Sequence, residues 1–162
     1  MAGKLSVTLF SDGGGERDSA SGGACIVRDP SNGSEVRLAL YLGGGTNNEA
    51  EISAGLLGFS FLRALEVAEQ VQISRVHWVC DSEYVLKSAS QYITAWQKNG
   101  WKTAARKPVK NQGLWRAYLV LAEDLPIDVE HVRGHTGHPE NEACDVATTW
   151  LQQNGPSFLA QG

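Results

Sequence analysis

Four carboxylates lie in four separate stretches of the chain, and each has neighbours that could direct it toward one common point. Asp12 lies in Leu-Phe-Ser-Asp-Gly-Gly and Asp81 in Trp-Val-Cys-Asp-Ser, where apolar, strand-like runs give way to polar turns. Glu51 and Asp145 lie in the opening turns of two predicted helices. Carboxylates that are packed together raise each other's pKa unless cations neutralise them. Oxygen ligands without a His or Cys spacing pattern favour magnesium or manganese over zinc, so the sequence predicts a site for one of these ions.

The elements that must position these carboxylates follow from the pattern of apolar residues. Apolar runs predict strands over residues 4–11, 24–28, 36–42, 75–80 and 127–132, and the Gly- and Ser-rich residues 13–23 predict a loop. A capping box at Thr46 and Glu49 predicts the start of a long helix, and Ser82 the cap of a short one. Further helices are predicted over 114–122 and from Pro139 to about residue 152. This order predicts an α/β fold with a five-stranded mixed sheet flanked by helices.

Length and composition predict one domain and limit its cellular setting. The 162 residues suffice for a single buried core, which we place in residues 1–154, with 155–162 as a flexible tail. The chain has no apolar stretch long enough to span a bilayer, and its first residues lack the apolar core of a signal peptide. Cys25, Cys80 and Cys144 lack metal-ligand spacing and predict free, buried thiols. We therefore expect a cytoplasmic protein that makes no contact with a membrane.

The net charge of −4 conceals an uneven distribution of charge along the chain. Between Tyr84 and Ala122 the sequence has no acidic residue but holds seven of the fourteen basic ones, so this segment carries +7 and the remainder −11. Such a concentrated basic stretch predicts a local contact with a polyanion. A solvated face without a partner would have the same composition, so charge alone does not decide between the two.

Five motifs in order along the chain resemble those of type 1 ribonuclease H. They are Ser-Asp-Gly-Gly, Thr-Asn-Asn-x-x-Glu, Cys-Asp-Ser-x-Tyr-Val, Trp-Gln-Lys-Asn-Gly-Trp-Lys-Thr-Ala-x-Arg-Lys-Pro-Val-Lys-Asn and Gly-His-x-Gly-His-Pro-Glu-Asn-Glu-x-Cys-Asp. The fourth motif resembles the basic protrusion of the bacterial enzymes and the last their C-terminal active-site segment. The resemblance covers almost the whole chain and implies a ribonuclease H-like fold.

The same resemblance implies a monomeric endonuclease that cuts the RNA strand of RNA–DNA hybrids to 5′-phosphate and 3′-hydroxyl ends. It implies two Mg²⁺ ions, with Mn²⁺ as a possible substitute, about 4 Å apart. Asp12 would bridge both ions, Asp145 would complete the site on the water side, and Glu51 and Asp81 would complete the leaving-group side. Glu142 lies one helical turn before Asp145 and could tune the first ion.

The two histidines near the C-terminus receive different predictions. A lone histidine is more often a loop residue satisfied by backbone groups. The resemblance instead places His135 on a mobile loop beside the scissile phosphate, where it shuttles a proton or assists product release, and makes it the fifth catalytic residue. His138 is predicted to be structural and to pack near the start of the last helix.

The resemblance also implies the residues that contact the hybrid. Asn47 and Asn48 match the readers of the minor groove and Thr46 a contact to a phosphate of the DNA strand, although helix capping alone would also explain them. The basic protrusion suits contact with the nucleic-acid backbone, whereas its Trp residues favour a packing role. The predicted substrate-binding set is Thr46, Asn47, Asn48, Lys98, Trp101, Lys102, Arg106, Lys107, Lys110 and Asn141.

Two positions depart from the family pattern. Asp18 and Glu83 stand where amides are expected, so both are predicted to weaken substrate binding by repelling phosphate.

Three other functions compete with hydrolysis of hybrids. They are a catalytically weak module that binds hybrids or double-stranded RNA, another nuclease or transposase of the superfamily, and a nucleotide-binding protein that uses Asp-Gly-Gly-Gly. The last lacks the spacing of a phosphate-binding loop.

Overall fold

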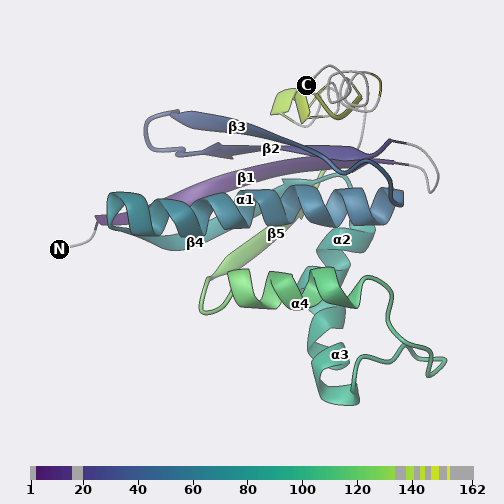
Figure 1. Ribbon diagram of the computed structural model, residues 1–162. Helices are drawn as coiled ribbons and strands as arrows, with labels where there is room; N and C mark the ends of the chain where they lie inside the picture. The colour runs from purple at the N-terminus through teal and green to yellow at the C-terminus, as the bar shows by residue number, and fades with distance from the viewer. Residues whose placement is uncertain are drawn as a thin grey trace.

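The computed structural model describes residues 3–15, 20–133, 138–140, 143–144, 147–149 and 153. Five strands form one mixed sheet in the order β3-β2-β1-β4-β5 (Figure 1). The strands are β1 Gly3–Gly14, β2 Gly22–Arg28, β3 Glu35–Tyr41, β4 Val71–Cys80 and β5 Ile127–His131. The first three strands pair antiparallel, whereas β4 runs parallel to both β1 and β5. The predicted five-stranded mixed sheet is confirmed.

Helices cover both faces of this sheet. They are α1 Asn47–Glu69, α2 Glu83–Lys87, the π-helical turn η1 Ser88–Tyr92, α3 Ile93–Asn99 and α4 Gln112–Leu121. Figure 1 shows α1 lying along one face, while α3 and the loop after it project away from the sheet. Successive side chains of a strand point to opposite faces. Leu9 accordingly belongs to the main core with Phe59 of α1, and Phe10 belongs to a smaller core with Cys144 of the C-terminal segment.

The predicted loop over residues 13–23 is wrong at both ends. β1 continues to Gly14 and β2 begins at Gly22, so that Gly13 pairs with Gly23 and Gly14 with Gly22. Composition suggested a loop because Gly disfavours strands, but here the missing side chains let α1 approach the sheet closely. A Cβ atom on Gly13 would lie 2.3 Å from the carbonyl carbon of Ala50, and one on Gly23 would lie 2.7 Å from the Cβ of Ala54.

The other predicted elements are present with shifted ends. β4 starts four residues before the predicted strand because it pairs with β1 from Gly3 onward. Residues 139–140, 143–144, 147–149 and 153 are helical, in agreement with a last helix that starts at Pro139. All three cysteines are buried and free, as predicted, and burial raises the pKa of Cys25 to about 12. No helix in the part of the chain that the structure describes is long and apolar enough to cross a membrane.

Candidate active site

Three of the four predicted carboxylates meet at one edge of the sheet. Oxygen atoms of Asp12, Glu51 and Asp81 all lie within 4.8 Å of one another. Asp81 directly follows β4, and Asp12 lies one residue beyond the last pair between β1 and β4, Ser11–Cys80. The carboxyl ends of adjacent parallel strands meet at the same edge, which explains why these two acids are neighbours. Asp145, the fourth predicted carboxylate, lies outside the described residues, as do His135, Asn141, Glu142 and Asp18.

Glu51 reaches this cluster because α1 is fixed in position and held close to β1. The predicted capping box is present: the Thr46 hydroxyl accepts a hydrogen bond from the Glu49 amide at 3.1 Å, and the Glu49 carboxylate accepts one from the Thr46 amide at 2.8 Å. Four residues after the start of the helix, Glu51 lies where Gly13 lets the α1 backbone touch β1. The cap and the glycine together place a helix carboxylate beside a strand carboxylate.

Burial sets the electrostatics of the cluster. Asp12 is 3% exposed and Glu51 5% exposed, and Oε2 of Glu51 has no hydrogen-bond partner among the described atoms. Burial, followed by the charges of Asp12 and Asp81, raises the pKa of Glu51 to about 10. A buried carboxylate oxygen without a hydrogen-bond partner is costly. A hard divalent cation would supply that partner, and the all-oxygen donor set fits magnesium or manganese.

Contacts of the neighbouring Ser82 and of the Asp81 carbonyl group hold Asp81 in place beside the open pocket. Ser82 caps α2 by accepting a hydrogen bond from the Val85 amide at 3.2 Å, as predicted. Nε2 of His131, at the end of β5, lies 3.1 Å from the carbonyl oxygen of Asp81. Ser82 also lines the open pocket around the carboxylates, together with Gly14, Asn47 and Thr148. Sequence reasoning missed His131 and Thr148, although Thr148 follows Asp145 by three residues in the sequence.

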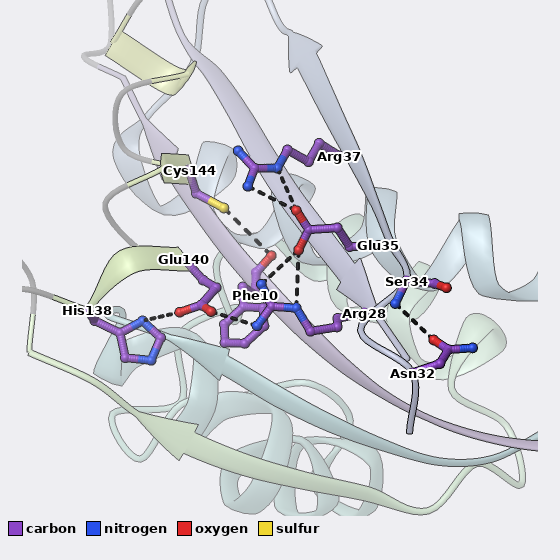
Figure 2. A network of polar contacts seen from close by, with 9 residues as sticks. All are labelled: Phe10, Arg28, Asn32, Ser34, Glu35, Arg37, His138, Glu140 and Cys144. Atoms are coloured by element: carbon purple, nitrogen blue, oxygen red, sulfur yellow. Dashed lines mark hydrogen bonds and ion pairs between the residues drawn. The ribbon is translucent and has the colours of Figure 1, made fainter. Parts of the chain in front are cut away.

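A polar network joins the C-terminal segment to the sheet (Figure 2). Arg28 on β2 contacts Glu140 at 2.6 Å and Glu35 on β3 at 2.7 Å, and its guanidinium lies 5.3 Å from the ring centre of Phe10. The Arg28 guanidinium holds the pKa of Glu140 below its ordinary value. His138 lies 3.6 Å from Glu140 and 5.7 Å from the Phe10 ring, which confirms its predicted packing role. The network fixes the residues that lead into the last helix.

The basic stretch presents its charges to solvent on an ordered support. The side-chain amide of Asn99 donates a hydrogen bond to the Lys102 carbonyl and accepts one from the Lys102 amide, and a bridge pairs Lys102 with Pro108. The basic side chains that the resemblance implicates are all exposed: Lys98, Lys102, Arg106, Lys107 and Lys110. Trp101, which we included in the substrate-binding set, is only 7% exposed and packs against Trp96 and beneath Arg116. Its geometry fits the packing role and leaves little surface for a ligand.

The polar residues near the site keep groups available for a ligand. Asn47 and Asn48 are exposed at the start of α1. The Thr46 hydroxyl accepts a hydrogen bond in the capping box, so its own proton can still be donated.

Glu83, which is predicted to repel phosphate, forms an ion pair with Lys87 at 2.6 Å. Lys87 also holds the pKa of Glu83 below its ordinary value, so the charge of Glu83 is partly compensated.

Comparisons with known proteins agree with this geometry. The model of the RNase H family matches residues 4–151. A ribonuclease H of Nitratidesulfovibrio vulgaris (strain DP4) is 40% identical over 145 residues, which are 88% of this chain and 86% of that protein. The solution structure of the PFV RNase H domain superposes with a TM-score of 0.74 at 23% identity and covers 93% of this chain and 96% of that one. LC11-RNase H1, solved in complex with an RNA/DNA hybrid, superposes with a TM-score of 0.65 at 15% identity and covers 88% and 96%.

Proposed function

Because this chain belongs to the ribonuclease H family, we propose that it is a metal-dependent endonuclease that hydrolyses the RNA strand of RNA–DNA hybrids. The observation that carries this proposal is the convergence of Asp12, Glu51 and Asp81 within 4.8 Å at the carboxyl edge of the sheet. Water attacks phosphorus, the bond to the 3′-oxygen breaks, and the products carry a 5′-phosphate and a 3′-hydroxyl. The protein would act as a monomer in the cytoplasm.

The four carboxylates would hold two Mg²⁺ ions, with Mn²⁺ able to replace them. Such ions, when bound, lower the pKa of water and stabilise the oxygen that leaves. Asp12 would be a ligand of both ions, Glu51 and Asp81 would hold the ion on the leaving-group side, and Asp145 would hold the ion on the water side. His135 handles a proton near the scissile phosphate.

Substrate selection would rest on the groove and the backbone of the hybrid. Asn47 and Asn48 reach the shallow minor groove, where 2′-hydroxyls distinguish RNA from DNA. Thr46 donates its free proton to a phosphate of the DNA strand, and Asn141 contacts the hybrid near the active site. The exposed lysines and arginine of the basic stretch contact phosphates without reading sequence.

Cleavage assays on labelled substrates test the proposed function. RNA paired with DNA should be cut in Mg²⁺ and spared in EDTA, while single-stranded RNA, duplex RNA and duplex DNA should remain intact. A polymerase should extend the 3′-ends of the products, and a phosphatase should remove phosphate from their 5′-ends. Tight hybrid binding without cleavage would instead support a catalytically weak binding module.

Neutralising part of the basic stretch should weaken binding of the hybrid and leave chemistry intact. Lys102, Arg106 and Lys107 are exposed, so changing all three to Gln removes charge without disturbing the core. Each lost phosphate contact should reduce the slope of log affinity against log salt by roughly 1. Hybrid affinity measured from 50 to 300 mM salt on a non-cleaving background gives the slope, and single-turnover rates at saturation should stay near those of the parent.

A matched triple variant removes the same charge elsewhere. Lys4, Arg37 and Arg75 are exposed side chains outside the basic stretch, and the ion pairs of Arg37 and Arg75 are on the surface. Exposed pairs of this kind contribute little to stability. Changing these three residues to Gln should leave the salt slope nearly unchanged. Equal slopes in both triple variants would show that the basic stretch has no special contact with the hybrid.

Removing the negative charge of Glu83 should modestly strengthen substrate binding. Because Lys87 already compensates this charge and both side chains are exposed, we expect Glu83→Gln to lower the KM about twofold at 50 mM salt, with a smaller effect at 300 mM. Steady-state kinetics at the two salt concentrations measure the change. Glu69→Gln, at the exposed end of α1, is the control. An unchanged or higher KM in Glu83→Gln at low salt would contradict the expectation.

A further inference from the structure

Two described side chains of the C-terminal segment contact backbone carbonyl groups of β1, and one of these groups belongs to a proposed metal ligand. The Thr148 hydroxyl donates a hydrogen bond to the carbonyl oxygen of Asp12 at 3.3 Å. The Cys144 thiol makes a weaker contact with the carbonyl oxygen of Phe10 at 3.9 Å (Figure 2). Thr148 is 2% exposed, so its hydroxyl is shielded from competing water.

The spacing of these two contacts fits a helix that runs along a strand. Cys144 and Thr148 are four residues apart and both helical, which separates them by about 6 Å along the helix axis. Phe10 and Asp12 are two residues apart in β1, which separates them by about 6.6 Å along the strand. The two separations are therefore similar, and Thr148 is the donor at the active-site end of β1.

The backbone of Asp12 is in a position where such a bond matters. The parallel ladder between β1 and β4 ends at the pair Ser11–Cys80, whereas β1 remains paired with β2 through Gly14. Asp12 therefore lies one residue beyond the last β1–β4 pair, at the active-site end of that ladder. Its side chain must hold its place beside those of Glu51 and Asp81, since oxygen atoms of the three carboxyl groups lie within 4.8 Å of one another.

We propose that Thr148 is a positioning residue that fixes the Asp12 carboxylate for metal binding through its hydrogen bond to the Asp12 backbone. Thr148 also lines the pocket around the three carboxylates, so its position couples the docked C-terminal segment to the metal site. The inference rests on the proposed function, since it assigns Asp12 the role of a metal ligand. Thr148 is not one of the proposed metal ligands, because its hydroxyl contacts the backbone carbonyl of Asp12.

The test compares variants that separate the hydroxyl from the methyl group of Thr148. Thr148→Val removes the hydroxyl and keeps the shape, whereas Thr148→Ser keeps the hydroxyl. Thr149→Val makes the same change at the adjacent, exposed threonine. Binding of Mg²⁺ alone is measured by calorimetry, thermal unfolding is measured in EDTA, and hybrid cleavage gives kcat and KM.

Loss of one buried hydrogen bond corresponds to about a threefold to tenfold change. In Thr148→Val we expect Mg²⁺ affinity and kcat to fall by about this factor, with KM changed less than about twofold. Thr148→Ser and Thr149→Val should stay close to the parent protein. If the valine variant does not fold, Thr148→Ala, which also lacks the hydroxyl, takes its place in the comparison with serine.

Two outcomes would overturn the inference. One is a lower unfolding temperature in Thr148→Val with unchanged Mg²⁺ affinity and kcat, which would make the hydroxyl merely structural. The other is equal impairment of the serine and valine variants, which would assign the effect to the methyl group. Failure of the proposed function would look different from both outcomes, because the parent protein would then bind Mg²⁺ but leave the hybrid uncut. The Mg²⁺ affinities of the variants would still decide the role of Thr148.

Discussion

Replacing Asp12 with Asn is expected to reduce cleavage of the RNA–DNA hybrid at least about a hundredfold. The proposed role of Asp12 is to bridge both metal positions, and an amide oxygen carries no charge to hold them. The change is nearly isosteric and leaves β1 and its pairing with β2 intact. Hybrid affinity and the circular dichroism spectrum should therefore remain close to those of the parent protein. Single-turnover cleavage in Mg²⁺ gives the rate.

The chain offers a matched control for this substitution. Asp124 is an exposed residue with a φ of 57°, a backbone conformation that Asn tolerates well. Asp124→Asn removes the same charge by the same chemical change, and its cleavage rate should equal that of the parent. If Asp12→Asn keeps more than a few per cent of the parental rate, the bridging role of Asp12 is wrong.

Replacing Glu51 with Gln should have two opposite effects: loss of cleavage and a more stable metal-free protein. Glu51 is a proposed metal ligand, so its loss should reduce cleavage at least about a hundredfold. Without metal, however, Glu51 is a buried carboxyl group with an oxygen that lacks a hydrogen-bond partner among the described residues. Gln is neutral at every pH and avoids the cost of ionising this group.

The stability effect should depend on pH in a defined direction. The pKa of Glu51 rises from 4.5 to about 10 in the folded protein. Between these values the folded state keeps a proton that the unfolded state has released, so the contribution of Glu51 to stability is fully present below pH 4.5 and is lost as the pH rises toward 10. The advantage of Glu51→Gln should grow from near zero at pH 4 to ~1–3 kcal/mol at pH 8.

Urea unfolding in EDTA at several pH values measures this difference. Glu69→Gln, on the same helix but exposed, should show no comparable dependence on pH. Saturating Mg²⁺ should stabilise the parent protein and reduce the advantage of the variant, because only the parent has the complete carboxylate set. A Glu51→Gln protein that is no more stable than the parent at pH 8 in EDTA would show that Glu51 is not strained by burial.

The sequence by itself determined the helix start, the strand ends and the exposed charges, because these features depend on residues close together in the chain. Thr46 and Glu49 specify the start of α1 because both partners of the capping box lie within one turn. Apolar runs that end at Asp12 and Asp81 placed two acids at the ends of adjacent strands, and the order of the motifs identified the family. Composition also located the exposed basic residues, because charged side chains are rarely buried.

Tertiary structure decided what depends on residues far apart in the chain. Gly13 and Gly23 suggested a loop by local propensity, yet they form a strand pair because α1 needs the space above them. The raised pKa of Glu51 follows from burial beside Asp12 and Asp81, which no local pattern specifies. Thr148 meets Asp12 across 136 residues, and Arg28 meets Glu140 across 112. Such contacts depend on how the sheet and the last helix pack, and propensities that act over a few residues carry no information about that packing.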